Sequence, residues 1–210
     1  MKKALVEFIG TFFLVFTIGC VVQSPAPGVI APLAIGAVLI AMIYAGGHVS
    51  GAHYNPAVTL AMLVNRSIKP LPACGYLAAQ FLAAVVAALA VNYLRPVAPE
   101  VAELVPAPAF LVEFLFTFAL VFVIMNVALA AGTGGNDFYG WAIGLTVMAG
   151  AFAVGDLSGA AFNPAVAVAI VSMGMTAPSG LPLYFGATLL GAVVAVFAYR
   201  AVQPAAAAAE

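Results

Sequence analysis

The chain of 210 residues is 66% hydrophobic, and only 6% of its residues are charged. Soluble domains carry charge on about 25% of their residues, so this composition excludes a soluble globular protein and indicates an integral membrane protein. The formal net charge of −1 argues against nucleic acid as a partner. The two cysteines, Cys20 and Cys74, lie in apolar stretches, which favours buried free thiols over a disulfide framework. No cluster of residues predicts a metal site or a cofactor.

Six stretches of the chain are apolar and close to the length of about 20 residues that a membrane-spanning helix requires. Met1-Lys2-Lys3 before the first of them resembles the start of a signal peptide, but that apolar run is long enough to span and contains Glu7, so we interpret it as a transmembrane helix. Proline-rich and glycine-rich clusters separate the stretches. The six expected spans are about Ala4–Val22, Val29–Ala45, Ala73–Leu94, Ala109–Ala131, Tyr139–Val154 and Leu181–Tyr199.

One nine-residue motif occurs twice between these spans. Residues 50–58 read SGAHYNPAV and residues 158–166 read SGAAFNPAV, with seven identical positions at an offset of 108 residues. Asparagine is a favourable N-cap, and proline suits the first turn of a helix because its missing N–H would be unpaired there. Each copy therefore predicts an irregular loop that opens a helix. The expected loops are Gly46–Tyr54 and Gly155–Phe162, and the expected helices run from Pro56 to about Val64 and from Pro164 to about Met173.

These two helices are too short to cross a membrane. Nine residues span about 13 Å, roughly half of the hydrocarbon core, so each segment must re-enter the side from which it came. The surrounding spans repeat as well: residues 6–16 match residues 112–122 at eight of eleven positions. Three spans in each half make the second copy inverted relative to the first, and inverted repeats with broken helices place the functional site at the membrane midplane. We expect one domain over residues 1–210, with repeats at about 4–95 and 109–200 and a linker at 96–108.

The distribution of basic residues orients this topology. With six spans, both termini lie on one side of the membrane. Five of the six basic residues fall on that side, and Arg95 alone falls opposite. Positive charge favours the cytoplasm, so we expect both termini to be cytoplasmic. The five residues are Lys2, Lys3, Arg66, Lys69 and Arg200. The short loops and the small size favour a bacterial inner membrane protein.

Two loops that meet at the midplane have a physical consequence. Each short helix directs its positively polarised N-terminus towards the centre, which repels cations and protons. Asn55 and Asn163 can cap these helices and still offer N–H donors to a passing molecule. Loop carbonyls supply acceptors on either side of them, and together they form a path for small neutral hydrogen-bonding solutes. The expected acceptors are the carbonyls of Gly51, Ala52, His53, Gly159, Ala160 and Ala161.

With paired Asn-Pro-Ala boxes at inverted-repeat spacing, the sequence resembles the aquaporins, the major intrinsic protein family. The resemblance covers residues 1–203 and implies an all-α channel of six tilted transmembrane helices and two re-entrant half-helices in two inverted repeats. It also implies a homotetramer with one pore in each subunit. Glu7 and Glu113 correspond to glutamates that brace the re-entrant loops, although a carboxylate inside a span is also compatible with proton relay. The boxes are Asn55, Pro56, Ala57 and Asn163, Pro164, Ala165.

The chain departs from the family at the selectivity filter. Water-selective and glycerol-conducting members have an arginine after the second box, where this chain has Val166. By similarity, the other filter positions are Ile35, Ala151 and Ala160. This filter is apolar, uncharged and wide, so exclusion of cations would depend on the half-helix dipoles alone. It favours glycerol, urea or metalloid acids as solutes, with a strict water channel as the alternative.

Other classes of function remain open at this stage. An inverted-repeat secondary transporter is the main rival, a non-conducting structural membrane protein is another, and an intramembrane enzyme is disfavoured because no nucleophile is accompanied by a base. His48 is a candidate pH-sensitive gate near the cytoplasmic mouth. Asp156 is either a solvated vestibule residue or an attractive charge at the extracellular mouth.

Overall fold

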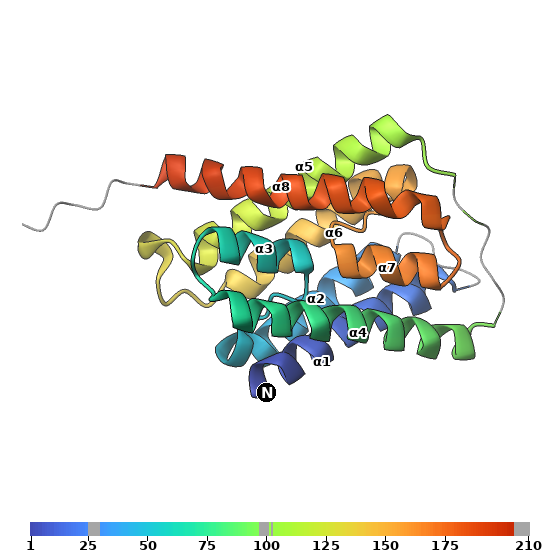
Figure 1. Ribbon diagram of the computed structural model, residues 1–210, viewed down its shortest axis with the longest axis horizontal. Helices are drawn as coiled ribbons and strands as arrows, with labels where there is room; N and C mark the ends of the chain where they lie inside the picture. The colour runs from blue at the N-terminus through green and yellow to red at the C-terminus, as the bar shows by residue number, and fades with distance from the viewer. Residues whose placement is uncertain (25–29, 97–100, 102, 204–210) are drawn as a thin grey trace, which may run out of the picture.

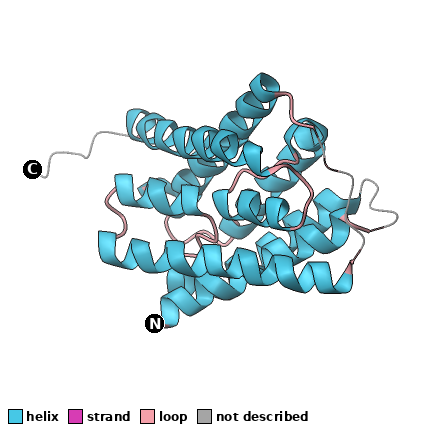
Figure 2. Ribbon diagram, turned by 45° about the vertical axis from the view of Figure 1, so that its right-hand side comes forward, coloured by secondary structure: helices cyan, strands magenta, loops and turns pink. Residues whose placement is uncertain are grey.

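Six long apolar helices dominate the computed structural model, which describes residues 1–24, 30–96, 101 and 103–203. Each helix is long and apolar enough to cross a membrane. Figure 2 shows that helices and loops make up the described part of the chain, without a β-strand. The long helices are α1 (Lys2–Val22), α2 (Ile30–Ser50), α4 (Pro70–Leu94), α5 (Pro106–Ala128), α6 (Tyr139–Ser158) and α8 (Leu181–Val202).

Two half-helices, α3 (Pro56–Val64) and α7 (Pro164–Ser172), lie inside this bundle. Both pack against α4 and α8, and Figure 1 shows them between these two helices. Each begins as the sequence predicts: the side-chain oxygen of Asn55 accepts a hydrogen bond from the Ala57 N–H at 2.8 Å, and Asn163 accepts one from Ala165 at 2.9 Å. Short 3₁₀ turns, η1 (Ala131–Thr133) and η2 (Pro178–Gly180), occur in two of the connections.

The two repeats join at the crossing of α2 and α6. A Cβ atom added to Gly36 would lie 3.1 Å from the carbonyl oxygen of Gly144, and one added to Gly144 would lie 2.9 Å from the carbonyl oxygen of Gly36. Glycine at both positions lets the two backbones approach as closely as membrane helix crossings often require. Within each repeat, α1 packs on α2 and α4, and α5 packs on α6 and α8.

The helices before the two re-entrant loops are longer than predicted. The expected ends at Ala45 and Val154 are wrong: α2 continues to Ser50 and α6 to Ser158, so only residues 51–54 and 159–162 separate them from the asparagine caps. Gly46 does not break α2, and the Tyr54 ring occupies the space that a side chain at this position would need. A Cβ atom at Gly46 would lie 2.0 Å from the Tyr54 hydroxyl oxygen. The glycine therefore serves packing, and the helix passes through it.

Two other helices begin earlier in the structure than the sequence predicts. Helices α4 and α5 start at Pro70 and Pro106, since proline fits the first helical turn, and not at Ala73 and Ala109. The prediction of buried cysteines is also wrong for Cys74, which is exposed on α4, while Cys20 is half-buried; both are free thiols. A membrane helix is apolar on its lipid-facing side too, so an apolar neighbourhood in sequence does not imply burial in the protein.

Helix α1 begins and α8 ends at the same side of the bundle, on the left of Figure 1. We call this side the termini face and the other side the opposite face. The tail 204–210 and residues 97–100 and 102 of the linker 96–108 lie outside the described residues.

Candidate pore

Glu7 on α1 holds the first re-entrant loop through hydrogen bonds to its carboxylate. Its Oε1 accepts hydrogen bonds from the Ser50 hydroxyl at 2.6 Å and the His53 N–H at 3.0 Å. Its Oε2 accepts them from the Tyr54 N–H at 2.7 Å and the Gln80 amide at 2.8 Å. Glu7 is fully buried. A buried carboxylate requires this many donors, and the loop in turn gains partners for N–H groups that no helix or sheet pairs.

Glu113 on α5 does the same for the second loop. Its Oε1 accepts hydrogen bonds from the Ser158 hydroxyl at 2.7 Å and the Ala161 N–H at 2.8 Å, and its Oε2 accepts one from the Phe162 N–H at 2.6 Å. The Ser158 hydroxyl also accepts a hydrogen bond from the Ala160 N–H at 3.1 Å, as the Ser50 hydroxyl does from the Ala52 N–H at 3.0 Å. Both loops therefore direct their N–H groups towards a glutamate and a serine.

The two loops share the same unusual backbone. Ala52 and Ala160 both have φ of 50°, and the next-but-one residues, Tyr54 and Phe162, both have φ of 48°. Non-glycine residues rarely adopt such left-handed conformations, which cost about 1–3 kcal/mol each and cluster at functional sites. The hydrogen bonds to the glutamates hold these residues in place. The strained φ angles therefore set the direction in which the backbone N–H and carbonyl groups of the loops point.

The loop carbonyls contrast with the loop N–H groups. Among the described residues, none donates a hydrogen bond to the six loop carbonyls that the sequence predicts as acceptors. The carbonyls immediately before them are paired: Ser50 accepts from the Tyr76 hydroxyl at 2.6 Å and Ser158 from the Tyr184 hydroxyl at 2.5 Å. Backbone acceptors at membrane depth need partners, and those of a loop that lines a water-filled path find them there.

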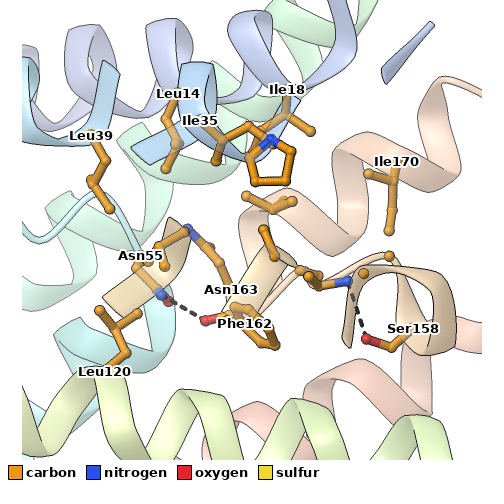
Figure 3. A pocket seen from close by; sticks show the side chains of 18 of the residues that line it. Leu14, Ile18, Ile35, Leu39, Asn55, Leu120, Ser158, Phe162, Asn163 and Ile170 are labelled. Carbon is orange, nitrogen blue, oxygen red and sulfur yellow. Dashed lines mark hydrogen bonds between the residues drawn. The ribbon is translucent and has the colours of Figure 1, made fainter. Parts of the chain in front are cut away.

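The asparagines of the two boxes meet at the centre of the bundle. The Asn55 amide donates a hydrogen bond to the Phe162 carbonyl at 2.9 Å (Figure 3), and the Asn163 amide donates one to the Tyr54 carbonyl at 2.9 Å. Each amide nitrogen has two hydrogens, so one per asparagine stays free for a permeating molecule. These reciprocal bonds also lock the two half-helices to each other across 107 and 109 residues of sequence.

A cavity of about 340 Å³ runs past both asparagines. Its walls are mostly aliphatic, and Figure 3 shows several of these side chains, such as Leu14, Leu39 and Leu120, around the asparagine pair. Most predicted site residues line it. These are Asn55, Asn163, the filter residues Ile35, Ala151, Ala160 and Val166, and the loop residues Ala52, His53, Gly159 and Ala161.

Some predicted site residues do not line this cavity. Gly51 is absent from its walls, and the prolines and alanines of both boxes are buried in the starts of α3 and α7. His48 is an exposed residue in the last turn of α2 and lies outside the cavity lining, so the structure offers no support for a gate at this position. At the opposite face, Asp156 and Glu103 are exposed and line the cavity mouth.

Sequence reasoning missed several residues that hold the loops. Tyr76 and Tyr184 anchor the carbonyls at the ends of α2 and α6, and Gln80 joins Glu7 to Thr59 through hydrogen bonds of 2.8 and 3.0 Å. The tyrosines lie 108 residues apart, the same offset as the loops, and this offset could have identified them. The described residues contain no group of three or more His, Cys, Asp or Glu side chains that could bind a metal ion.

Comparison with known proteins agrees with this geometry. A sequence model of the major intrinsic protein family matches residues 1–131 and residues 108–210. The glycerol uptake facilitator protein-like 6 of Lactiplantibacillus plantarum is 38% identical over 95% of this chain and 97% of its own length. Aquaporin NIP1-4 of Oryza sativa subsp. japonica is 35% identical over 97% of this chain and 77% of its own length. The fold is similar to that of the aquaglyceroporin from Plasmodium falciparum, with a TM-score of 0.78, 23% identity and 96% coverage of both chains.

The chain therefore belongs to the major intrinsic protein family. It is a membrane channel and not an enzyme. The expected fold, with six transmembrane helices and two half-helices in inverted repeats, is confirmed.

Proposed function

We propose that this channel conducts water together with small neutral hydrogen-bonding solutes such as glycerol, urea or metalloid acids. The observation that carries the proposal is the arrangement of polar groups in the cavity. Five lining loop residues with unpaired carbonyls (Ala52, His53, Gly159, Ala160 and Ala161) and two asparagine amides provide acceptors and donors, while the remaining wall is mostly aliphatic. A polyol can place its hydroxyl groups on the carbonyls and its carbon atoms against the aliphatic side chains.

The outer filter supports solutes larger than water. Ala151 and Ala160 are small, and Val166 stands where the family has an arginine, so nothing charged narrows the cavity there. The similarity to a protein named as a glycerol uptake facilitator-like protein points in the same direction. Without the arginine, the exclusion of cations rests on the positively polarised starts of α3 and α7.

A strict water channel and a secondary transporter are the alternatives. A coupled transporter needs an ionisable group near the midplane that can change its partners. Glu7 and Glu113 are the buried carboxylates of the described residues, and both are committed to loop hydrogen bonds. This favours passive conduction.

We further propose that the termini face is cytoplasmic, that the membrane is a bacterial inner membrane and that the channel assembles as a homotetramer. Five basic residues near the ends of α1, α3, α4 and α8 support the orientation. The aliphatic and aromatic side chains exposed on the long helices suit contact with lipid or with a second subunit.

The test uses purified protein in liposomes and stopped-flow light scattering, which records shrinkage in an impermeant osmolyte and re-swelling as glycerol enters. Rapid glycerol entry is expected for the wild type. Val166→Arg should lower the glycerol rate by about tenfold or more while water still passes, since it narrows and charges the filter. Val166→Met is the matched uncharged variant, and it separates the effect of bulk from that of charge.

Two results would contradict the proposal. Water flux with glycerol excluded by the wild type would identify a strict water channel. Saturable glycerol entry that depends on an ion gradient would identify a transporter, whereas passive flux rises linearly with the gradient.

A further inference from the structure

The outer filter has a counterpart on the other side of the asparagine pair. The offset of 108 residues that relates the two loops maps each filter residue onto a position nearer the termini face. We call Ile35, Ala151, Ala160 and Val166 the outer ring. Their counterparts, the inner ring, are Ile143, Ile43, Ala52 and Val58 in the same order. All four inner-ring residues line the cavity too.

The two rings differ in one residue. Isoleucine, alanine and valine recur at three positions, whereas Ala151 of the outer ring corresponds to Ile43 of the inner ring. Both residues line the cavity, but Ile43 is only 3% exposed whereas Ala151 is half-buried, so less free space lies beside Ile43 than beside Ala151. A larger side chain at the same position of a similar ring leaves less room for a solute. The inner ring is therefore the narrower of the two.

A second difference lies one turn further from the centre. Gly155 lines the cavity near the opposite face, and a Cβ atom added there would meet nothing within 4 Å. Its counterpart Gly47 faces Tyr139, whose hydroxyl oxygen would lie 3.4 Å from an added Cβ atom. Tyr139 is the counterpart of Ala31, another residue of the cavity wall. On the side of the termini face, Tyr139 therefore occupies the position that the small residue Ala31 occupies on the side of the opposite face.

The shape of the cavity agrees with both differences. Towards the opposite face it extends to Val22, Asp156 and Met175. Towards the termini face the lining of the cavity reaches the inner ring. It does not include Gly47, His48 or Tyr139, which are described residues nearer that face. The lining of this cavity thus continues from the asparagine pair to the opposite face, and towards the termini face it stops at the inner ring.

We infer that this channel selects solutes by size at the inner ring, with Ile43 as the main determinant, and not at the outer ring. The inference rests on the proposed conduction of small neutral solutes and adds where their upper size is set. Water and three-carbon polyols pass Ile43, and five-carbon polyols are held back there.

The test compares permeability to water, glycerol and xylitol in liposomes for the wild type and three variants. Ile43→Ala opens the inner ring, Ala151→Ile closes the outer ring to the same degree, and the double variant exchanges the two side chains. We expect Ile43→Ala to raise xylitol permeability by about tenfold. Ala151→Ile should lower glycerol permeability only about twofold, since it adds a second barrier equal to the first. The double variant should exclude xylitol again.

Water permeability and elution volume in detergent verify that each variant is folded. If Ile43→Ala does not fold, Ile43→Val provides the smaller change in the same direction. Xylitol exclusion unchanged by both inner-ring variants, together with a tenfold loss of glycerol flux in Ala151→Ile, would overturn the inference. If the wild type passes water and excludes glycerol, the proposed solute range is wrong. The inner ring is still confirmed in that case if Ile43→Ala admits glycerol, and overturned if it does not.

Discussion

The two re-entrant loops use one bonding scheme with unequal support. In both, a buried glutamate accepts two backbone N–H groups and a serine hydroxyl, and a tyrosine hydroxyl bonds to the last helical carbonyl. The first loop has additional bonds. The Gln80 amide donates to Glu7 at 2.8 Å and to the Thr59 hydroxyl at 3.0 Å, and Thr59 lies 3.1 Å from Nδ1 of His53.

The second loop lacks these additional partners. The counterparts of His53 and Thr59 are Ala161 and Ala167. The counterpart of Gln80 is Thr188, whose hydroxyl donates to the carbonyl of Tyr184 on its own helix at 2.7 Å. The shared bonds are those that a re-entrant backbone needs at membrane depth, because its N–H groups have no other partner. The additional bonds stabilise one loop only, so the two halves should respond differently to the same change.

The largest effect is expected from the glutamates. Glu113→Gln should lower the free energy of unfolding by about 3 kcal/mol, because the introduced amide has one acceptor oxygen for three donors and leaves a buried donor unpaired. Glu7→Gln should cost about half as much, since the Gln80 amide can turn its oxygen towards the new N–H group. Thermal unfolding in detergent measures the difference. Equal losses would mean that Gln80 does not compensate.

The tyrosines test the same comparison with a smaller change. Tyr184→Phe and Tyr76→Phe each remove one hydrogen bond to a helix-end carbonyl, at a cost of about 1 kcal/mol. Tyr184→Phe should reduce protection from hydrogen exchange in the loop at 159–162 more than Tyr76→Phe reduces it in the loop at 51–54, because the second loop has fewer other hydrogen bonds. Greater loss in the loop at 51–54 would show that the additional bonds of the first loop carry little of its stability.

Removing the additional bonds should make the first loop resemble the second. Gln80→Leu is expected to lower the free energy of unfolding by about 1–2 kcal/mol and to leave water flux within about twofold of the wild type, because the backbone bonds of Glu7 remain. Thr188→Val is the matched control in the other half, with an expected cost below about 1 kcal/mol. A collapse of water flux in Gln80→Leu would show that the shared bonds are not sufficient on their own.

The smallest effect is expected at the cavity mouth. Asp156→Asn and Glu103→Gln remove exposed carboxylates, which attract cations and repel anions but leave neutral solutes unaffected. Glycerol and water permeability should change by less than about twofold at physiological salt, where exposed charges are screened. A larger change in glycerol flux, measured in the same liposome assay, would assign these carboxylates a direct role in binding.

Much of this fold is determined by local features of the sequence. The six spans follow from apolar length, and the starts of both half-helices follow from Asn-Pro pairs that cap a helix wherever they occur. The inversion of the second repeat follows from the odd number of spans in each half. The loop carbonyls follow from the irregular backbone at membrane depth. The filter residues could be predicted only through resemblance, because composition does not reveal which side of an all-apolar helix faces a pore.

The tertiary structure decided the rest, for the reason that the contacts involved join distant parts of the chain. The Tyr54 ring packs against Gly46 within helix α2, and Asn55 bonds to a carbonyl 107 residues away. The same packing puts Ile43 and Ala151, which are counterparts in the two repeats, into the wall of one cavity. The sequence alone determines that two loops must enter the membrane and meet; only helix packing determines which side chains surround the path between them.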